Sequence, residues 1–438
     1  MENKVVTRFA PSPTGFLHLG AYRTAIFAYL YAKKHNGIFV LRIEDTDKER
    51  SKKEYEENII ESLKWLGLSY DQFYRQSENA DRHKVYLEKM IKDGTAYISK
   101  EEAKDGSGVI KEIVRFKNPN INVTFQDEIK GEVTMNTTDL GDFVIAKNLN
   151  EPLFHLAVVV DDFEEGVTHI IRGEDHVSNT PRQILIQRAI GAPTPVYAHL
   201  PLVLGADKLK LSKRRGALSV TEYKKQGFLP EAILNGVAFV GWNPGTDKEI
   251  FTHDELVEAF DLTRVQKSPA IFNEEKLEWF NKEHIKLLSK KEINKNILEW
   301  LPKESQNMQN PKIIPVILER ISKWGDVKDM AERGELDFFF KAPEIQKEKL
   351  IFKNTSPEKI RDNLNLAIKA LAELTEENFT QENIKNSLML IADNLESRGE
   401  LLHPVRYALS GLDKSPDPFT ISSVIGKNET LSRLQKAI

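Results

Sequence analysis

The sequence predicts an α/β fold: a doubly wound parallel sheet, split by a β-containing insertion and followed by all-α C-terminal domains. Three observations predict it. Strand and helix patterns alternate from residue 5 to about residue 67, short alternating strands replace them after Gly94, and helical spacing dominates after about Gly216. Alternating strands and helices are typical of a parallel sheet with helices on both faces.

The first part of the sheet begins with a strand at residues 5–9 and a helix that Gly37 ends. A second buried strand follows in IFVLRI, residues 38–43. Ser51 and Glu54 then form a predicted capping box ahead of a helix that Gly67 closes. This βαβα order favours parallel strands.

The inserted piece runs from about Gly94 to Asn150. Its short runs NVTF, GEVTM and DFVIAK are separated by Asn, Gly and Pro, which predicts short strands. The βα pattern returns in GVTHII, then in a helix with Thr180 as the predicted N-cap and Gly191 at its end, then in the strand LPLVL. We therefore expect one α/β domain in two parts.

Helical patterns fill the rest of the chain. In residues 356–374, Ser356 is the predicted N-cap, Pro357 stands in the first turn, and the apolar residues fall along one stripe: Ile360, Leu364, Ile368 and Leu371. We expect a chain of helical subdomains up to the C-terminus.

Composition limits the functional classes. The 438 residues carry a net charge of −4 and no cysteine, which excludes disulfides and thiolate zinc sites. His18, Gly20 and Arg23 interrupt the first apolar run, so no signal peptide is predicted, and no run reaches the roughly 20 apolar residues of a membrane span. We predict a cytoplasmic protein that binds any nucleic acid through local basic patches.

The loop RFAPSPTGFLHLGAYRT raises the question of phosphate binding. Gly15 and Gly20 have the spacing of a P-loop, but Ala21 and Tyr22 replace its Lys and its Ser or Thr, and no third glycine completes a dinucleotide fingerprint. The loop still leads from a strand into a helix N-terminus, which attracts anions. His18 could therefore bind a phosphate, or it could be an ordinary capping or packing histidine.

A second basic segment, DKLKLSKRRG, gathers five cations: Lys208, Lys210, Lys213, Arg214 and Arg215. Such a loop could close on a triphosphate and stabilise charge on leaving pyrophosphate. It could also be a solvated turn or a nonspecific RNA-binding patch.

Taken together, HLGA and KLSKR resemble the two ATP signatures of class I aminoacyl-tRNA synthetases. The resemblance is closer to the glutamyl-tRNA synthetases, in RFAPSPTGFLHLG, LRIEDTDKERS, THIIRGEDHVSNTPRQ, KLSKRRGALSV, GFLPEAILNGVAFVGW and SPAIFNEEKLEWFN. It covers most of residues 5–285 and reappears in GELLHPVRYALSG and SPDPFTISSVIGK.

This resemblance implies ATP-dependent ligation of L-glutamate to the 3′ end of tRNA(Glu) through a glutamyl-adenylate. It implies His18 and Lys213 as catalytic residues, with Gly20, Lys210 and Ser212 also at the ATP. It further implies Mg²⁺ with the ATP. No zinc is expected, because the cysteines that hold it in some members are missing.

The amino-acid pocket can also be argued from charge. Carboxylates are best held by arginine and an ammonium by a carboxylate, and Arg8, Arg172 and Glu44 all stand at predicted strand ends. The resemblance assigns Arg8 and Arg172 to the glutamate carboxylates, and Glu44 with Ser12 to the amino group. Structural ion pairs are the alternative. The resemblance also places Phe154 at the glutamate pocket, where the family usually has a tyrosine, and Phe154 lacks the hydroxyl of that tyrosine.

The carboxylates Asp45 and Asp47 do not predict a metal site, since capping and salt bridging explain them better. The family's organisation predicts a Rossmann-type catalytic domain in two parts (1–93 and 166–225), an inserted acceptor-end-binding domain (94–165), a helical stem-contact domain (226–310) and a helical anticodon-binding domain (311–438). We expect a monomer. Whether tRNA(Gln) is charged besides tRNA(Glu) stays open.

Several other functions remain as alternatives. One is a glutaminyl enzyme, although APSPTG differs from the Pro-Glu-Pro-Asn typical of that branch. Another is the truncated relative that modifies a queuosine base in tRNA, which the long helical half disfavours. The remaining two are a non-catalytic RNA-binding relative and a small-molecule nucleotidyltransferase.

Overall fold

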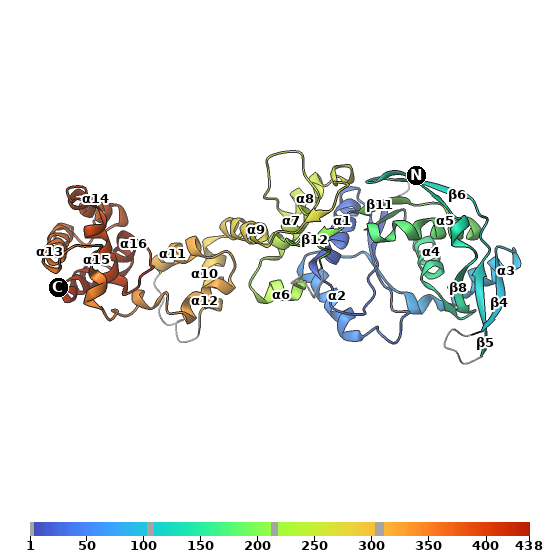
Figure 1. The fold of residues 1–438 in the computed structure, drawn as a ribbon, viewed down its shortest axis with the longest axis horizontal. Helices are drawn as coiled ribbons and strands as arrows, with labels where there is room; N and C mark the ends of the chain where they lie inside the picture. Colours follow the sequence, from blue (N-terminus) through green and yellow to red (C-terminus); the bar gives the residue numbers. More distant parts are fainter. Residues whose placement is uncertain (1–3, 103–108, 212–217, 303–310) are drawn as a thin grey trace. The chain divides into compact units, whose positions relative to one another are not determined.

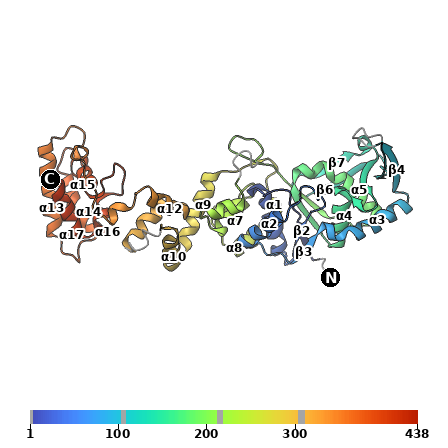
Figure 2. The same cartoon turned by 90° about the horizontal axis from the view of Figure 1, so that it is seen from below.

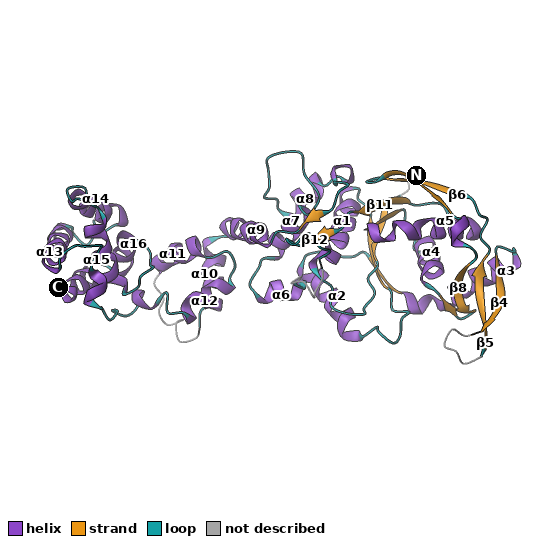
Figure 3. Ribbon diagram, in the orientation of Figure 1, coloured by secondary structure: helices purple, strands orange, loops and turns teal. Residues whose placement is uncertain are grey.

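A computed structural model describes residues 4–102, 109–211, 218–302 and 311–438 of the chain (Figure 1). The chain divides into two compact units, Met1–His284 and Ile285–Ile438. Strands occur in the first unit, whereas the described part of the second contains helices and turns (Figure 3). Among the described residues, no helix combines the length and apolar character that crossing a membrane requires.

The first unit is built on a sheet of seven strands in the order β3-β2-β1-β10-β11-β6-β7. Neighbouring strands are parallel from β3 through β6, and β7 is antiparallel to β6. The strand bounds are β1 Val6–Phe9, β2 Ile38–Ile43, β3 Gln72–Arg75, β6 Asn122–Asp127, β7 Gly131–Asn136, β10 His169–Gly173 and β11 Val196–Leu200. The strand order reverses at β1, which lies between β2 and β10. The predicted doubly wound α/β fold is therefore confirmed.

Helices cover both faces of this sheet (Figure 1, Figure 2). Ile171 and Ala198 belong to the core that includes α1 (Leu19–Lys34) and α2 (Lys53–Trp65), whereas Ile170 and Tyr197 belong to the core of α3 (Ala80–Lys92), α4 (Phe154–Glu164) and α5 (Thr180–Ile190). Successive residues of one strand thus enter opposite cores, as the period of two requires.

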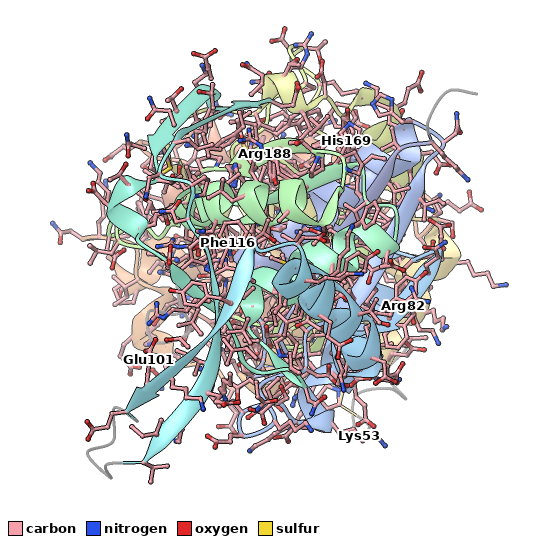
Figure 4. The ribbon with its side chains drawn as sticks, turned by 90° about the vertical axis from the view of Figure 1, so that its right-hand side faces the viewer. Lys53, Arg82, Glu101, Phe116, His169 and Arg188 are labelled. Carbon is pink, nitrogen blue, oxygen red and sulfur yellow. The ribbon has the colours of Figure 1, made fainter. Side chains whose placement is uncertain are left out.

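The predicted insertion divides between two sheets. Four of its strands form a separate antiparallel sheet in the order β4-β5-β8-β9: β4 Ala96–Glu102, β5 Ile110–Phe116, β8 Phe143–Asn148 and β9 Glu151–Pro152. Figure 4 labels Glu101 and Phe116 on this sheet, where Phe116 stacks on Phe143 with centroids 5.0 Å apart. The β6–β7 hairpin instead joins the main sheet, because β6 pairs with β11. Local patterns predict such strands but not their partners.

Helices make up most of the remaining chain. The first unit also contains a short parallel pair, β12 (Val203–Leu204) with β13 (Ala270–Ile271), and the helices α6 Val220–Lys225, α7 Pro230–Ala238 and α8 His253–Ala259. Helix α9, Glu274–Leu287, begins in the first unit and ends in the second. The second unit contains α10 Lys290–Trp300, α11 Ile314–Arg320, α12 Gly325–Glu332, α13 Pro357–Glu373, α14 Gln381–Ala392, α15 Gly399–Ser410, α16 Pro418–Ile425 and α17 Lys427–Ala437. The all-α prediction is confirmed for the described part of the second unit, whereas the two-residue strand β13 is an exception in the range 226–310.

Some predicted caps are present and others are not. Ser356 caps α13 by accepting a hydrogen bond from the backbone of Lys359, and Gly191 ends α5 in the left-handed region at φ 80°. The capping box at Ser51 is wrong, because Lys52 is the N-cap of α2 and no side chain caps it. Thr180 is also wrong as a cap, since α5 begins at Thr180 itself and Asn179 precedes it as the N-cap.

Candidate functional site

A cavity of about 300 Å³ opens at the carboxyl ends of β1 and β10, where the strand order reverses. Ligands bind at this position in doubly wound sheets. Most of the predicted site residues line it: Arg8, His18, Gly20, Glu44, Phe154, Arg172 and Lys210. Ser12 is exposed and does not line the cavity. Ser212 and Lys213 lie outside the described residues.

One side of the cavity is formed by the start of α1. His18 is the N-cap residue of this helix, and its imidazole lies against Gly20: a Cβ added at Gly20 would stand 3.0 Å from both Cε1 and Nδ1 of His18. A helix N-terminus favours an anion through its dipole. Lys210, whose Nζ is 3.5 Å from an Asp175 carboxylate oxygen, lines the same cavity. This side therefore suits phosphate groups.

Arg172 lies on β10 and is 6% exposed. Its Nε donates to His199 Nε2 at 3.1 Å and its Nη2 donates to Thr180 Oγ1 at 2.8 Å. Burial lowers the pKa of Arg172 to about 10. Within the described residues, Arg172 forms no ion pair and no hydrogen bond through Nη1. It is a buried guanidinium that lines the cavity and has no anionic partner within hydrogen-bonding distance among the residues that the structure describes.

Arg8 and Glu44 lie in a charged cluster beside it. Arg8 Nε donates to Asp162 Oδ1 at 3.1 Å, and Arg42 Nη1 contacts the same oxygen at 2.8 Å. Arg42 also reaches Glu44 at 3.3 Å and Glu165 at 2.7 Å. Burial raises the pKa of Glu44, and the two arginines oppose that rise. This cluster fixes the positions of Arg8 and Glu44 at the cavity wall.

Phe154 contributes an aromatic wall at the start of α4 and is 38% exposed. Its ring centroid lies 5.8 Å from that of His176, which also lines the cavity. Burial and the nearby Arg172 lower the pKa of His176 to about 4, so its imidazole is neutral near pH 7. Because Phe154 has no hydroxyl, its ring can pack against a substrate but cannot form a hydrogen bond with it.

Sequence reasoning missed the supporting residues Arg42, Asp127, Asp162 and His199, all of which are buried. A usable signal was present for some of them. Arg42 interrupts the apolar strand IFVLRI, and Asp162 follows the apolar run LAVVV. Charged residues are almost never fully buried unless they are paired. No local signal pointed to Asp127, because its partner is distant in sequence.

The acidic pair after β2 behaves as expected. Asp45 accepts hydrogen bonds from the Ser77 backbone at 2.8 Å and its hydroxyl at 2.6 Å, while Asp47 pairs with Arg50 at 2.6 Å. In the part of the chain that the structure describes, no three His, Cys, Asp or Glu side chains gather as a metal site.

Comparison with known families gives two matches. The family described as "tRNA synthetases class I (E and Q), catalytic domain" matches residues 4–105 and 98–279. The family described as "Anticodon binding domain" matches residues 271–438. The first match contains every residue assigned above to the cavity.

Individual proteins are similar along nearly the whole chain. The "Glutamate--tRNA ligase" of Aquifex aeolicus is 42% identical, with 93% of each chain covered. The "Glutamate--tRNA ligase 1" of Petrotoga mobilis is 38% identical, with 98% of this chain and 97% of the relative covered. A solved glutamate tRNA ligase from Elizabethkingia meningosepticum, in complex with its amino acid, matches with a TM-score of 0.84 at 33% identity and 99% coverage of both chains. The chain therefore belongs to the glutamyl-tRNA synthetases, within the class I tRNA synthetases of the E and Q type.

Proposed function

We propose that this chain ligates L-glutamate to the 3′ end of tRNA(Glu), using ATP and passing through a glutamyl-adenylate. Family membership supports the reaction, and the relatives named above carry the same activity in their names. Glutamate is proposed as the amino acid because the buried guanidinium of Arg172 lines the cavity and has no anionic partner in the described chain.

The two ends of glutamate find complementary groups in this cavity. A carboxylate at Arg172 would complete its missing ion pair, and Arg8 offers a second guanidinium on the neighbouring strand β1. Glu44, which Arg42 holds at 3.3 Å, is the proposed partner of the substrate ammonium. Glutamine has the same shape but would leave Arg172 without a charge partner, which disfavours it.

The reaction then proceeds in two transfers. A glutamate α-carboxylate oxygen attacks the α-phosphorus of ATP, the bond from that phosphorus to the bridging oxygen breaks, and pyrophosphate leaves. A ribose hydroxyl of the terminal tRNA adenosine next attacks the adenylate carbonyl carbon, loses its proton, and AMP leaves as the ester forms. Arg172, Arg8 and Glu44 would position the amino acid for both attacks.

The phosphate-binding side supplies the other half of the first transfer. His18 and the α1 N-terminus around Gly20 are the proposed contacts to ATP, together with Lys210, which lines the same cavity. Donors placed where negative charge develops stabilise a transition state. Lys213 and Ser212 stay predictions for the same role. Mg²⁺ is commonly carried by substrate phosphates, and no step here is assigned to it.

The domain roles, assembly and location complete the proposal. We propose that the insertion at 94–165 receives the acceptor end of tRNA, that 226–310 contacts the stem, and that 311–438 reads the anticodon. The anticodon-binding family matched by residues 271–438 supports the last role. A cytoplasmic monomer remains our expectation.

The experiment that tests this function is charging of purified tRNA(Glu) with radiolabelled glutamate and ATP. We expect ester formation with glutamate and little with glutamine. Pyrophosphate exchange that depends on glutamate, ATP and tRNA would establish the adenylate step. Purified tRNA(Gln) in parallel reactions tests whether the second tRNA is accepted. Charging with glutamine in preference to glutamate would contradict the role given to Arg172.

A further inference from the structure

A chain of buried hydrogen bonds connects Arg172 to the β6–β7 hairpin. Arg172 Nε donates to His199 Nε2 at 3.1 Å, and His199 Nδ1 lies 2.6 Å from Asp127 Oδ2. His199 is fully buried and Asp127 nearly so. The three residues come from three strands, β10, β11 and β6, and only Arg172 lines the cavity.

The donors and acceptors fix one arrangement of protons. A guanidinium can only donate, so His199 Nε2 must accept and its ring proton must sit on Nδ1. Burial lowers the pKa of His199, which keeps the ring neutral. Burial alone would raise the pKa of Asp127, but the His199 hydrogen bond and the backbone N–H groups of Lys130 and Ile129 lower it. An ionised Asp127 therefore holds the tautomer that leaves Nε2 free to accept from Arg172.

Asp127 is itself held by the turn of the hairpin. Its Oδ1 accepts from the backbone N–H of Ile129 at 3.0 Å and of Lys130 at 2.8 Å. The Lys130 ammonium pairs with Glu174, two residues after Arg172. The hairpin turn thus contacts the segment around Arg172 directly through Lys130 and Glu174, and it reaches Arg172 itself through Asp127 and His199.

We infer that Asp127 and His199 are positioning residues that orient the Arg172 guanidinium toward the substrate carboxylate, so that the β6–β7 hairpin helps to set the affinity for glutamate. This inference rests on the proposed function. Arg172 donates through Nε to His199 and through one Nη2 proton to Thr180, and its Nη1 has no hydrogen-bond partner among the described residues. A guanidinium anchored along one edge presents its remaining donors in a fixed direction, which favours two-point binding of a carboxylate.

Two substitutions of His199 separate the two hydrogen bonds. In His199→Asn, the shorter amide can reproduce Nδ1 and keep the bond to Asp127, but it cannot reach Arg172. In His199→Gln, the longer amide can place an oxygen near the position of Nε2 and accept from Arg172, while the bond to Asp127 is lost. The pair changes one buried ring in two ways, so a general loss of packing affects both.

The test uses the full-length protein in steady-state charging of tRNA(Glu), with KM measured separately for glutamate and ATP. We expect His199→Asn to raise the KM for glutamate about tenfold to 100-fold and His199→Gln to raise it no more than about threefold. The KM for ATP should stay within about twofold in both. Thr134→Val, which removes an exposed hydroxyl pair with Thr124 on the same hairpin, is the control and should change neither constant.

The outcomes separate the two proposals. If the wild-type protein does not charge tRNA(Glu) with glutamate, the proposed function fails before any variant is compared. If it does, equal KM values for glutamate in His199→Asn and the wild type, or equal increases in the Asn and Gln variants, would overturn the positioning role. Should His199→Asn not fold, Asp127→Asn replaces it, with an expected threefold to tenfold rise in the KM for glutamate. An unchanged value there would equally overturn the inference.

Discussion

Two buried arginines on strands of the same sheet have opposite surroundings. Arg42, on β2, is fully buried and lies within 4.0 Å of carboxylate oxygens from Glu44, Asp161, Asp162 and Glu165. Burial alone would lower the pKa of Arg42, but these four carboxylates raise it well above its usual value. Arg172, on β10, is held by a neutral imidazole and a hydroxyl, and burial lowers its pKa.

The difference shows how a buried charge can be assigned a role. A guanidinium whose acids come from its own chain is satisfied before any ligand arrives, and its loss leaves carboxylates uncompensated. A buried guanidinium without an acidic partner has lost its hydration, and no ion pair offsets this cost. Binding of an anionic substrate would therefore stabilise it most. Arg42 therefore serves the fold and Arg172 is the proposed substrate contact.

The largest expected effect tests the structural side of this contrast. Arg42→Met removes the cation that the four buried carboxylates share, and breaking such a group costs about 3 to 5 kcal/mol of unfolding free energy. Urea unfolding followed by circular dichroism measures it. Arg50→Met, which removes an exposed partner of Asp47, is the matched control and should leave the free energy of unfolding nearly unchanged. Equal losses in the two variants would contradict the role given to Arg42.

The second effect tests the substrate side. Arg172→Ala should raise the KM for glutamate by about 30-fold to several thousand-fold, the equivalent of about 2 to 5 kcal/mol, and should narrow the preference for glutamate over glutamine. Arg172→Lys should recover only part of the loss, since an ammonium lacks the planar fork. Charging with both amino acids gives these values. Arg188→Ala, an exposed arginine on α5, is the control (Figure 4). A near-normal KM in Arg172→Ala would make Arg172 a structural residue.

The contrast also explains what could be predicted from sequence. The strand IFVLRI was predicted with its bounds, because its apolar run is a local signal. Arg8, Glu44 and Arg172 were placed at strand ends, and the carboxyl ends of parallel strands meet at one edge. The pairing of β6 with β11 brings Asp127 to His199, 72 residues away. No local pattern encodes such a contact.

Thr180 shows why a correct pattern can still mislead. Its place before Pro181 is typical of an N-cap, but its hydroxyl accepts from Arg172 at 2.8 Å and contacts the His176 carbonyl oxygen at 3.1 Å. The Thr180 hydroxyl therefore serves as an acceptor for a buried guanidinium and does not cap the helix. Similarly, Pro201 and Leu202 divide the predicted strand LPLVL into the end of β11 and the start of β12, and the Pro201 carbonyl accepts from the buried Arg23.

A third prediction uses pH to examine the acids around Arg42. Burial raises the pKa of Glu165 to about 7 from an unfolded value near 4.5, so the folded state binds more protons between these values. Its contribution to stability is therefore present below about pH 4.5 and is lost as the pH rises through 7. Relative to Glu165→Gln, the wild type should lose on the order of 2 to 3 kcal/mol between pH 4.5 and 7.5.

Urea unfolding of both proteins across this range measures the difference, and comparing them cancels the titration of the buried histidines. A difference between Glu165→Gln and the wild type that does not change with pH would show that Arg42 keeps Glu165 ionised throughout. Arg42 would then compensate all of its carboxylates at neutral pH, which would sharpen its contrast with Arg172.

The smallest expected effect concerns the phosphate-binding side of the cavity, where the space beside Gly20 sets the position of His18. In Gly20→Ala, the added Cβ would stand 3.0 Å from two ring atoms of His18, so the imidazole must shift by a few tenths of an ångström. Alanine stabilises a helix relative to glycine by up to about 1 kcal/mol, so unfolding should be unchanged or slightly harder. Small displacements of a positioned group slow a reaction, and we expect adenylate formation to fall about tenfold with the KM for glutamate unchanged. Pyrophosphate exchange at saturating glutamate measures this rate.

Because Gly20 and Arg172 line one cavity, a rise in the KM for glutamate in Gly20→Ala would show that the phosphate side and the amino-acid side are not separable.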